Sequence, residues 1–269
     1  MSEETSIQIV ENYEILAENK IIIQAFTGSG LVASIVAHHL IEKLDLKEKG
    51  YISSPLIPAV GIVRNGIIQR PIRIFENNEY LLILSEIGIS QDNLNEFIES
   101  LFIWYNSIDP SSIVVIGALP TGRPSDATDL RYSVVASDSI TQQYIEEKDV
   151  TVLPQGAVYG SVALSLMEAK RYGISSFGIL SNCIATIPDY LAAKKVVEIL
   201  QILLEESIPT EPLNKNALEL KEHLIRRDKN KLKTQKGSTN DDFDLFSPKF
   251  NKDPFYDDSD DDEDLSKFI

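Results

Sequence analysis

Two short runs that are rich in Ile and Val constrain the fold of this chain more than any other feature. They are residues 20–26 (KIIIQAF) and residues 112–117 (SIVVIG). A strand that is apolar on both faces is typical of a parallel sheet covered by helices on each side. Both runs are far shorter than the roughly 20 apolar residues that cross a bilayer. The chain is therefore expected to form a layered α/β fold and not to span a membrane.

Segments with helical periodicity follow these runs. After the first run comes a glycine turn, residues 27–30, and then apolar residues at helical spacing through residue 44. The same period predicts helices over residues 91–105, 138–147, 160–172, 189–206 and 214–227, with further strands over residues 132–136 and 176–181. A chain that alternates strands and helices in this way packs helices on a common sheet. We expect a three-layer α/β/α fold with a mostly parallel central sheet.

The segment between residues 60 and 85 interrupts this alternation, because it has turn signals but no helical period. Asn65-Gly66, between two apolar pairs, is the strongest short hairpin signal, since both central positions of a type I′ turn need positive φ. Residues 72–75 and 80–85 predict a second hairpin that turns at residues 77–78. The fold is therefore expected to carry an inserted β-meander.

Charge divides the chain into two parts. The net charge is −16, and residues 241–269, with eleven acids against three lysines, carry half of it. A basic run over residues 221–236 precedes this acidic stretch. Low hydrophobicity and high charge predict disorder, so we expect an α/β domain at residues 1–227 and a disordered tail at residues 228–269, first basic and then acidic. The acidity also argues against nucleic acid and anionic membranes as partners.

Cysteine usage and the first residues indicate the compartment. Cys183 is the single cysteine, so no internal disulfide can form. Residues 1–4 are acidic and lack the basic and then apolar order of a signal peptide. Both observations predict a cytoplasmic protein.

Three separated stretches carry a family resemblance. They are residues 24–40 (QAFTGSGLVASIVAHHL), residues 153–160 (LPQGAVYG) and residues 187–189 (IPD), which precede a helix. Together they resemble the PAC2 family of proteasome assembly chaperones, in its archaeal form. The resemblance implies an α/β/α fold related to that of nucleoside phosphorylases. It also implies a non-catalytic protein that assembles or binds the proteasome and forms homo-oligomers.

The resemblance further implies a docking mode. Some members of the family insert a C-terminal tripeptide, hydrophobic-Tyr-any residue, into pockets between proteasome α subunits. This sequence ends Lys267-Phe268-Ile269, so an aromatic ring is kept while the phenol hydrogen bond, of about 1 kcal/mol, is lost. We therefore expect a proteasome assembly chaperone or proteasome-binding adaptor that docks partly through these three residues. Its partner is expected to be the α subunits of the 20S proteasome or a related ring.

A second class of function remains open, an enzyme of phosphorylase-like fold acting on a nucleoside or a carboxylate. Gly28, Ser29 and Gly30 precede a helix and could hold a phosphate on backbone N–H groups. The alternative is a tight turn with Ser29 as the helix N-cap. Arg123 follows the run at residues 112–117, and it either clamps an anionic ligand or stabilises a turn.

The remaining reactive residues predict no catalytic set, metal or cofactor. His38 and His39 are adjacent, and neighbouring helical residues diverge by about 100°, so they cannot bind one ion together. One of them is expected to pack and the other to face solvent or a partner. Cys183 is expected to be a buried, inert thiol.

The helix predicted at residues 31–44 favours self-association. Leu31, Val32 and Ile35 belong to a helix that is apolar nearly all round, so it has to be covered on every side. A second copy of the chain could supply part of that cover. We expect a closed homo-oligomer.

Overall fold

The main element of the fold is one eight-stranded sheet. The computed structural model describes residues 6–15, 18–121 and 131–234. The chain divides into two units, Met1–Glu222 and His223–Ile269, and the sheet belongs to the first. Its strand order is β1-β3-β6-β7-β2-β8-β10-β9. In chain order these strands are β1 Gln8–Glu11, β2 Ile21–Phe26, β3 Lys47–Ser53, β6 Ile72–Glu76, β7 Tyr80–Ser85, β8 Ser112–Pro120, β9 Tyr132–Ala136 and β10 Ser176–Cys183.

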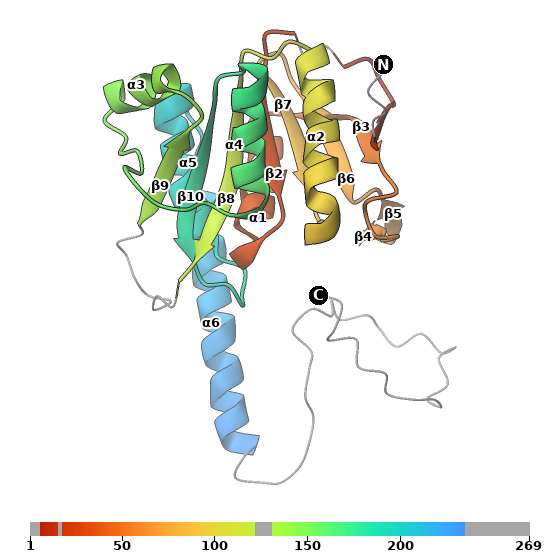
Figure 1. Ribbon diagram of the computed structural model, residues 1–269. Helices are drawn as coiled ribbons and strands as arrows, with labels where there is room; N and C mark the ends of the chain where they lie inside the picture. The colour runs from red at the N-terminus through yellow and green to blue at the C-terminus, as the bar shows by residue number, and fades with distance from the viewer. Residues whose placement is uncertain (1–5, 16–17, 122–130, 235–269) are drawn as a thin grey trace. The chain divides into compact units, whose positions relative to one another are not determined.

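Helices cover both faces of the sheet: α1 Val32–Lys43 and α5 Tyr190–Leu204 lie on one face, and α2 Gln91–Ser107 and α4 Gly160–Tyr172 lie on the other (Figure 1). A short 3-10 turn, η1 Ser29–Leu31, precedes α1, and α3 Ser139–Glu147 follows the edge strand β9. The last helix is α6 Glu211–Thr234. Along β2, Ile23 and Ala25 belong to the core with α1 and α5, whereas Ile22 and Phe26 belong to the core with α2 and α4. Both faces of this strand are therefore buried, which explains why it is apolar apart from Gln24, whose buried amide donates a hydrogen bond to Ser165 (2.7 Å). The three-layer α/β/α fold is confirmed.

Parallel pairing is confined to the centre of the sheet. β7, β2, β8 and β10 run parallel, whereas β6, β3 and β1 on one side and β9 on the other pair antiparallel. β6 and β7 are joined by a tight turn in which the side-chain oxygen of Asn77 accepts hydrogen bonds from the N–H groups of Glu79 (2.9 Å) and Tyr80 (2.8 Å). Strands joined by so short a turn have to be antiparallel. The α/β class is confirmed, and the expectation of a mostly parallel sheet is correct only for its four central strands.

Both hairpins expected between residues 60 and 85 are present, but only one is an insertion. β4 (Ile62–Arg64) and β5 (Ile67–Gln69) form a separate two-stranded sheet. φ is 52° at Asn65 and 77° at Gly66, as a type I′ turn requires. β6 and β7 instead join the main sheet. β1 and β3 were not expected, because β3 opens with three charged residues, KEK, and β1 is only four residues long.

Helix boundaries follow local capping groups. The Asp138 carboxylate caps α3 by accepting hydrogen bonds from the N–H groups of Ile140 (2.9 Å) and Thr141 (2.8 Å). Gly173, with φ of 69°, closes α4 as expected. α6 runs beyond residue 227, where its end was predicted, to Thr234. Within the described ranges, no helix is both long and apolar enough to cross a membrane.

Candidate functional site

A crevice opens at the edge of the sheet where the parallel strands β2, β7 and β8 end. Its volume is about 500 Å³, and it is lined by the loops that follow these strands and by the start of α4. Gly28 and Ser29 line it after β2, Ile87 after β7, Leu119 at the end of β8 and Tyr159 before α4. Ligands of α/β proteins bind in this position, outside the carboxyl ends of parallel strands. The crevice is therefore the candidate site.

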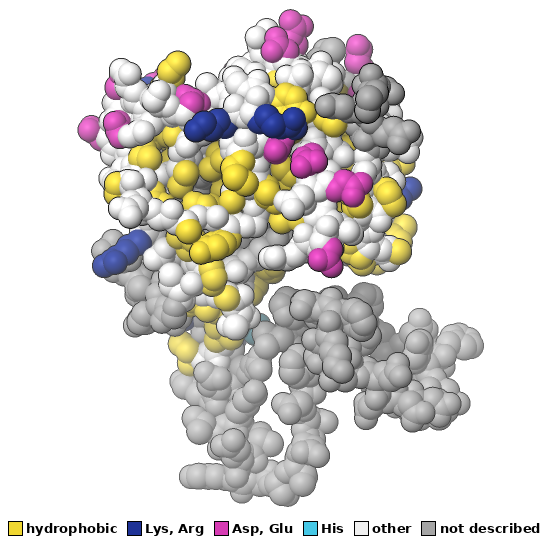
Figure 2. Space-filling view, viewed as in Figure 1, with side chains coloured by type: hydrophobic (Ala, Val, Ile, Leu, Met, Phe, Trp, Pro, Cys, Tyr) yellow, Lys and Arg dark blue, Asp and Glu magenta, His cyan; other side chains and the backbone are white. Residues whose placement is uncertain are grey.

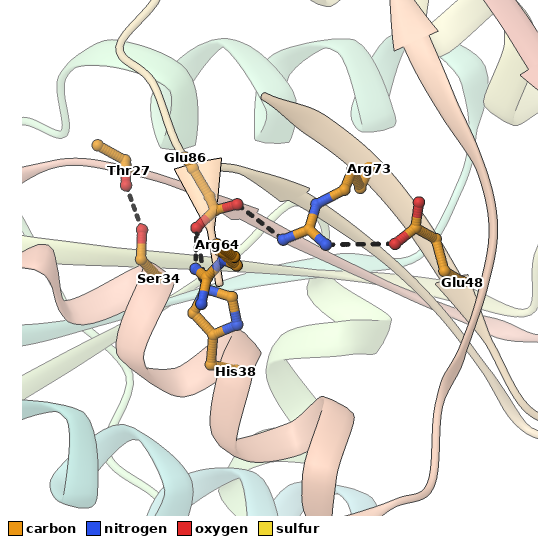
Figure 3. A network of polar contacts seen from close by, with 7 residues as sticks. All are labelled: Thr27, Ser34, His38, Glu48, Arg64, Arg73 and Glu86. Carbon is orange, nitrogen blue, oxygen red and sulfur yellow. Dashed lines mark hydrogen bonds and ion pairs between the residues drawn. The ribbon is translucent and has the colours of Figure 1, made fainter. Parts of the chain in front are cut away.

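The described walls of the crevice are uncharged. No Asp, Glu, Lys, Arg or His is among the described residues that line it, and its polar side chains are Thr27, Ser29, Gln91, Tyr159 and Ser161. The hydroxyl of Thr27 is hydrogen-bonded to that of Ser34 on α1 (Figure 3). General acid–base catalysis needs a titratable group within hydrogen-bond reach of the substrate. These walls offer apolar contact together with hydroxyl, amide and backbone groups for hydrogen bonding.

Gly30 has a packing role and does not line the crevice. Its φ is 63°, and a Cβ here would lie 2.9 Å from the carbonyl oxygen of Ile184. Its own carbonyl accepts a hydrogen bond from the N–H of Asp189 (2.8 Å), so the turn after β2 is fastened to the start of α5. This arrangement is the tight turn considered above.

The expectation that Ser29 is the N-cap of α1 is wrong. The N-cap position is Leu31, with φ of 51° and no hydrogen bond from a capping side chain. The backbone of Gly30 and of Leu31 has the left-handed conformation, with positive φ, so these two residues cannot belong to the α-helix. The helix begins at the next residue, Val32. Ser29 therefore belongs to the preceding turn, where it lines the crevice.

Four of the predicted site residues lie outside the described part of the chain. Arg123 falls within residues 122–130, and Lys267, Phe268 and Ile269 fall within residues 235–269. Their roles stay predictions. Thr121, just before the first of these segments, donates its N–H to the carbonyl of Cys183 (3.0 Å), which fastens the end of β8 to that of β10.

A polar network adjoins the crevice and was not expected from the sequence. The carboxylate of Glu86, which follows β7, accepts hydrogen bonds from Arg73 of β6 (2.7 Å) and from Arg64 of β4, and lies 3.1 Å from Nε2 of His38 on α1 (Figure 3). Arg73 also donates to Glu48 of β3 (3.2 Å). These residues are spread over the sequence and follow no spacing rule. Only the tertiary fold brings them together.

The electrostatics of the network centre on Glu86. Burial raises the pKa of its carboxyl group, but hydrogen bonds from His38, Arg64 and Arg73 outweigh that effect and lower the pKa to about 2. The carboxylate is therefore charged at neutral pH. It ties the β4–β5 hairpin, through Arg64, to α1 and to the main sheet.

The two adjacent histidines have different environments, as expected. His38 is partly exposed within the network, whereas His39 is buried, with Nε2 2.7 Å from the carbonyl oxygen of Pro209. Burial lowers the pKa of His39, against the opposing effect of the Pro209 hydrogen bond. Cys183 is buried, as expected. The described residues contain no cluster of three or more potential metal ligands.

These features define a class: a three-layer α/β/α protein whose crevice, at the carboxyl edge of the sheet, has uncharged described walls. Within that class, residues 22–226 match the model of the PAC2 family, and the chain belongs to this family. An uncharacterized protein of Methanocaldococcus jannaschii is 26% identical over 212 residues, which cover 79% of this chain and 87% of the relative.

Solved structures share the fold. PbaA of Pyrococcus furiosus, an archaeal homolog of proteasome-assembly chaperone, has a TM-score of 0.78 and 24% identity, covering 86% of this chain and 95% of PbaA. PbaB of the same organism, an archaeal proteasome activator, has a TM-score of 0.73 and 19% identity, covering 84% of this chain and 100% of PbaB. A PAC2 family protein from Streptomyces avermitilis has a TM-score of 0.62 and 18% identity, covering 77% and 95%. At these identities the likeness establishes the fold alone.

Proposed function

We propose that this chain is a non-catalytic partner of the proteasome, acting as an assembly chaperone or as an adaptor. The match of residues 22–226 to the PAC2 family carries the proposal. The likeness to PbaA and PbaB, whose names refer to proteasome assembly and activation, supports it. The apolar and hydrogen-bonding groups on the described walls of the crevice suit a binding role.

We further propose that docking is made partly by Lys267, Phe268 and Ile269 on the α subunits of the 20S proteasome or a related ring. Burying the ring of Phe268 in an apolar pocket contributes roughly 1.5–3 kcal/mol. A lysine of the partner can pair with the terminal carboxylate. The aliphatic stem of Lys267 can cover apolar surface while its ammonium group stays in water.

Measuring binding to immobilised 20S proteasome tests this docking mode. Phe268→Ala should weaken binding at least tenfold, mainly through faster dissociation. Phe268→Tyr should strengthen it about fivefold, because the phenol regains a hydrogen bond of about 1 kcal/mol. Phe255→Ala, which removes another ring of the same tail, is the matched control and should leave the affinity unchanged.

Two other outcomes would each contradict a separate part of the proposal. If deletion of residues 267–269 leaves the affinity unchanged, the anchor is wrong and binding comes from another part of the chain. If neither the full chain nor any variant binds the proteasome, the proposed partner is wrong.

The enzymatic alternative has one supporting observation, the position of Gly28 and Ser29 in a crevice at the carboxyl edge. An anionic substrate would need a cation, and Arg123 is the candidate that would have to supply it. Calorimetric titration of the full chain with a nucleoside and with inorganic phosphate tests this reading. Micromolar binding that is lost in Arg123→Ala and kept in Arg131→Ala would favour an enzyme.

We also propose self-association, although α1 obtains much of its cover within its own chain. Val32 is fully buried, Ile35 packs against the core, and α5 lies alongside within the same chain. The cover that was expected in part from a second copy is thus largely intramolecular.

A further inference from the structure

The β4–β5 hairpin buries little of its apolar surface against the rest of the fold. Among the described strands, β4 and β5 pair only with each other. Val63, Ile67 and Ile68 are 63%, 67% and 73% exposed, and Figure 2 shows hydrophobic side chains at this end of the molecule. The hairpin also borders a hollow of about 540 Å³, which is lined by residues 52–54, 57–61 and 68–71. An isolated two-stranded hairpin is marginally stable in water, so polar contacts have to help hold this one in place.

Two arginines make polar contacts between the hairpin region and the main fold. The guanidinium of Arg70, just after β5, lies over the ring of Tyr51 on β3, 4.6 Å from its centre. Arg64 of β4 donates to the carboxylate of Glu86 and to Nε2 of His38 on α1, the latter at 2.7 Å (Figure 3). The hairpin is thus fastened to α1 and to the end of β7 through one guanidinium.

Of the groups in this contact, Arg64 is the one that can move. Its side chain is 42% exposed and belongs to the separate two-stranded sheet. His38 extends from the regular helix α1, and Arg73 is buried in the main sheet, where it binds the second oxygen of Glu86 at 2.7 Å. Glu86 therefore keeps a cationic partner when Arg64 leaves.

His38 contacts Arg64 and Glu86 through the same ring nitrogen, and the two contacts require opposite protonation of that nitrogen. Arginine is only a donor, so Nε2 has to offer a lone pair to Arg64. The ionised carboxylate is only an acceptor, so Nε2 has to carry a proton to bond Glu86, 3.1 Å away. Neutral imidazole can leave Nε2 unprotonated, whereas imidazolium carries a proton on both nitrogens. A charged His38 therefore bonds Glu86 and excludes Arg64.

Other charged groups near α1 are engaged with one another. Glu42 follows His38 by one turn on the same helix, and α5 packs against α1 from the other side of the chain's core. The further ion pairs of these elements and of the neighbouring strands are Lys43 with Glu42, Arg73 with Glu48, and Lys194 and Lys195 with Glu198. A proton gained by His38 therefore acts first on its two contact partners, Arg64 and Glu86.

We propose that protonation of His38 displaces Arg64 from Glu86 and loosens the β4–β5 hairpin, so that the hairpin is a pH-sensitive element of the fold. Histidine is the side chain whose charge ordinarily changes between pH 5 and pH 8. Ile87 and Gly88, which directly follow Glu86, line the crevice, so the change takes place beside the candidate site. The effect needs neither the proteasome nor a second copy of the chain.

Hydrogen–deuterium exchange of the full-length chain at pH 8 and pH 5 tests the proposal, with protection factors that correct for the intrinsic effect of pH. The amides of residues 62–69 should lose about fivefold in protection at pH 5, as expected for the loss of one partly exposed ion pair. The amides of β6 and β7 should keep their protection. Glu86 does not cause the change, because its pKa is about 2 and it stays ionised at both pH values.

Three variants separate His38 from other titrating groups. His38→Gln cannot gain a proton, but its amide oxygen can still accept from Arg64, so the hairpin should be equally protected at both pH values. His38→Lys carries a cation at both pH values and should give low protection at both. His223→Gln, at an exposed histidine of α6, is the matched control and should keep the pH dependence of the unaltered chain.

Circular dichroism of the variants should match that of the unaltered chain, since the side chain of His38 is partly exposed. Equal protection of residues 62–69 at both pH values in the unaltered chain would overturn the proposal. So would a pH dependence that persists in His38→Gln, which would assign the effect to another group such as the buried His39. High protection of the hairpin in His38→Lys at pH 8 would show that a cation at this position does not displace Arg64, and the proposal would then be wrong.

Discussion

The carboxylate of Glu86 gathers interactions from three elements that are distant in the sequence. Arg73 donates from β6, Arg64 from β4, and His38 approaches from α1. A buried carboxylate without such partners would be neutralised, whereas here the pKa falls from 4.5 to about 2, because these hydrogen bonds outweigh burial. A folded-state pKa below the unfolded value means that this group stabilises the fold above pH 4.5. That stabilisation is lost as the pH falls toward 2.

We expect Glu86→Gln to lower the free energy of unfolding by about 2 kcal/mol at neutral pH, since two arginines lose their anionic partner. Urea denaturation at pH 7 and at pH 3 measures the effect, which should shrink at the lower pH. Glu42→Gln is the control, because the ion pair of Glu42 with Lys43 is exposed and should not contribute measurably. An equal loss at both pH values would contradict the role of ionised Glu86.

Gly30 and Gly28, two residues apart, provide a matched pair for testing the turn after β2. A Cβ at Gly30 would meet the carbonyl of Ile184 at 2.9 Å in a left-handed backbone, whereas a Cβ at Gly28 would meet nothing within 4 Å. Gly30→Ala should therefore destabilise the fold by about 1–3 kcal/mol. Gly28→Ala should leave stability near that of the unaltered chain. Thermal unfolding of both variants decides the point, and equal melting temperatures would contradict it.

Among the elements, α3 shows most directly how a side chain sets a helix boundary. Asp138 accepts hydrogen bonds from the N–H groups of Ile140 and Thr141, and also from the hydroxyls of Thr141 (2.7 Å) and Ser137 (2.8 Å). Burial raises the pKa of Asp138, but these hydrogen bonds outweigh it and keep the pKa below its usual value. The helix begins where these N–H groups find an acceptor.

We expect Asp138→Ala to cost about 1 kcal/mol of stability, because the first N–H groups of α3 lose their acceptor. Asp138→Asn should cost less, since its amide oxygen can still cap the helix. Chemical denaturation of the three proteins measures the order. If both variants are equally destabilised, the charge rather than the cap is what stabilises α3.

At the scale of the whole molecule, the division into a folded part and a charged tail stays a prediction. The described helix α6 reaches Thr234, whereas the composition predicts that order ends near residue 227. Limited proteolysis followed by mass spectrometry should leave a stable core that ends near Arg227. A protected fragment that extends into residues 241–269 would contradict the two-part description.

The sequence by itself determined the elements and the layers of this protein. Continuous apolar runs, glycine turns and helical periods are local properties, so β2, β8, α2 and α4 and the Asn65-Gly66 turn could be predicted from neighbouring residues alone. The PAC2 resemblance came from motifs of the same local kind, and the family match over residues 22–226 confirms it.

Only the tertiary structure decided how these elements meet. The antiparallel flanks of the sheet depend on pairing between strands such as β3 and β6. The edge strand β1 has only four residues, so its apolar pattern is too short to predict a strand. The Glu86 network and the described lining of the crevice both join residues that lie far apart in the sequence. Their spacing along the chain carries no signal, because contacts of this kind arise from the packing of layers and not from the period of any one element.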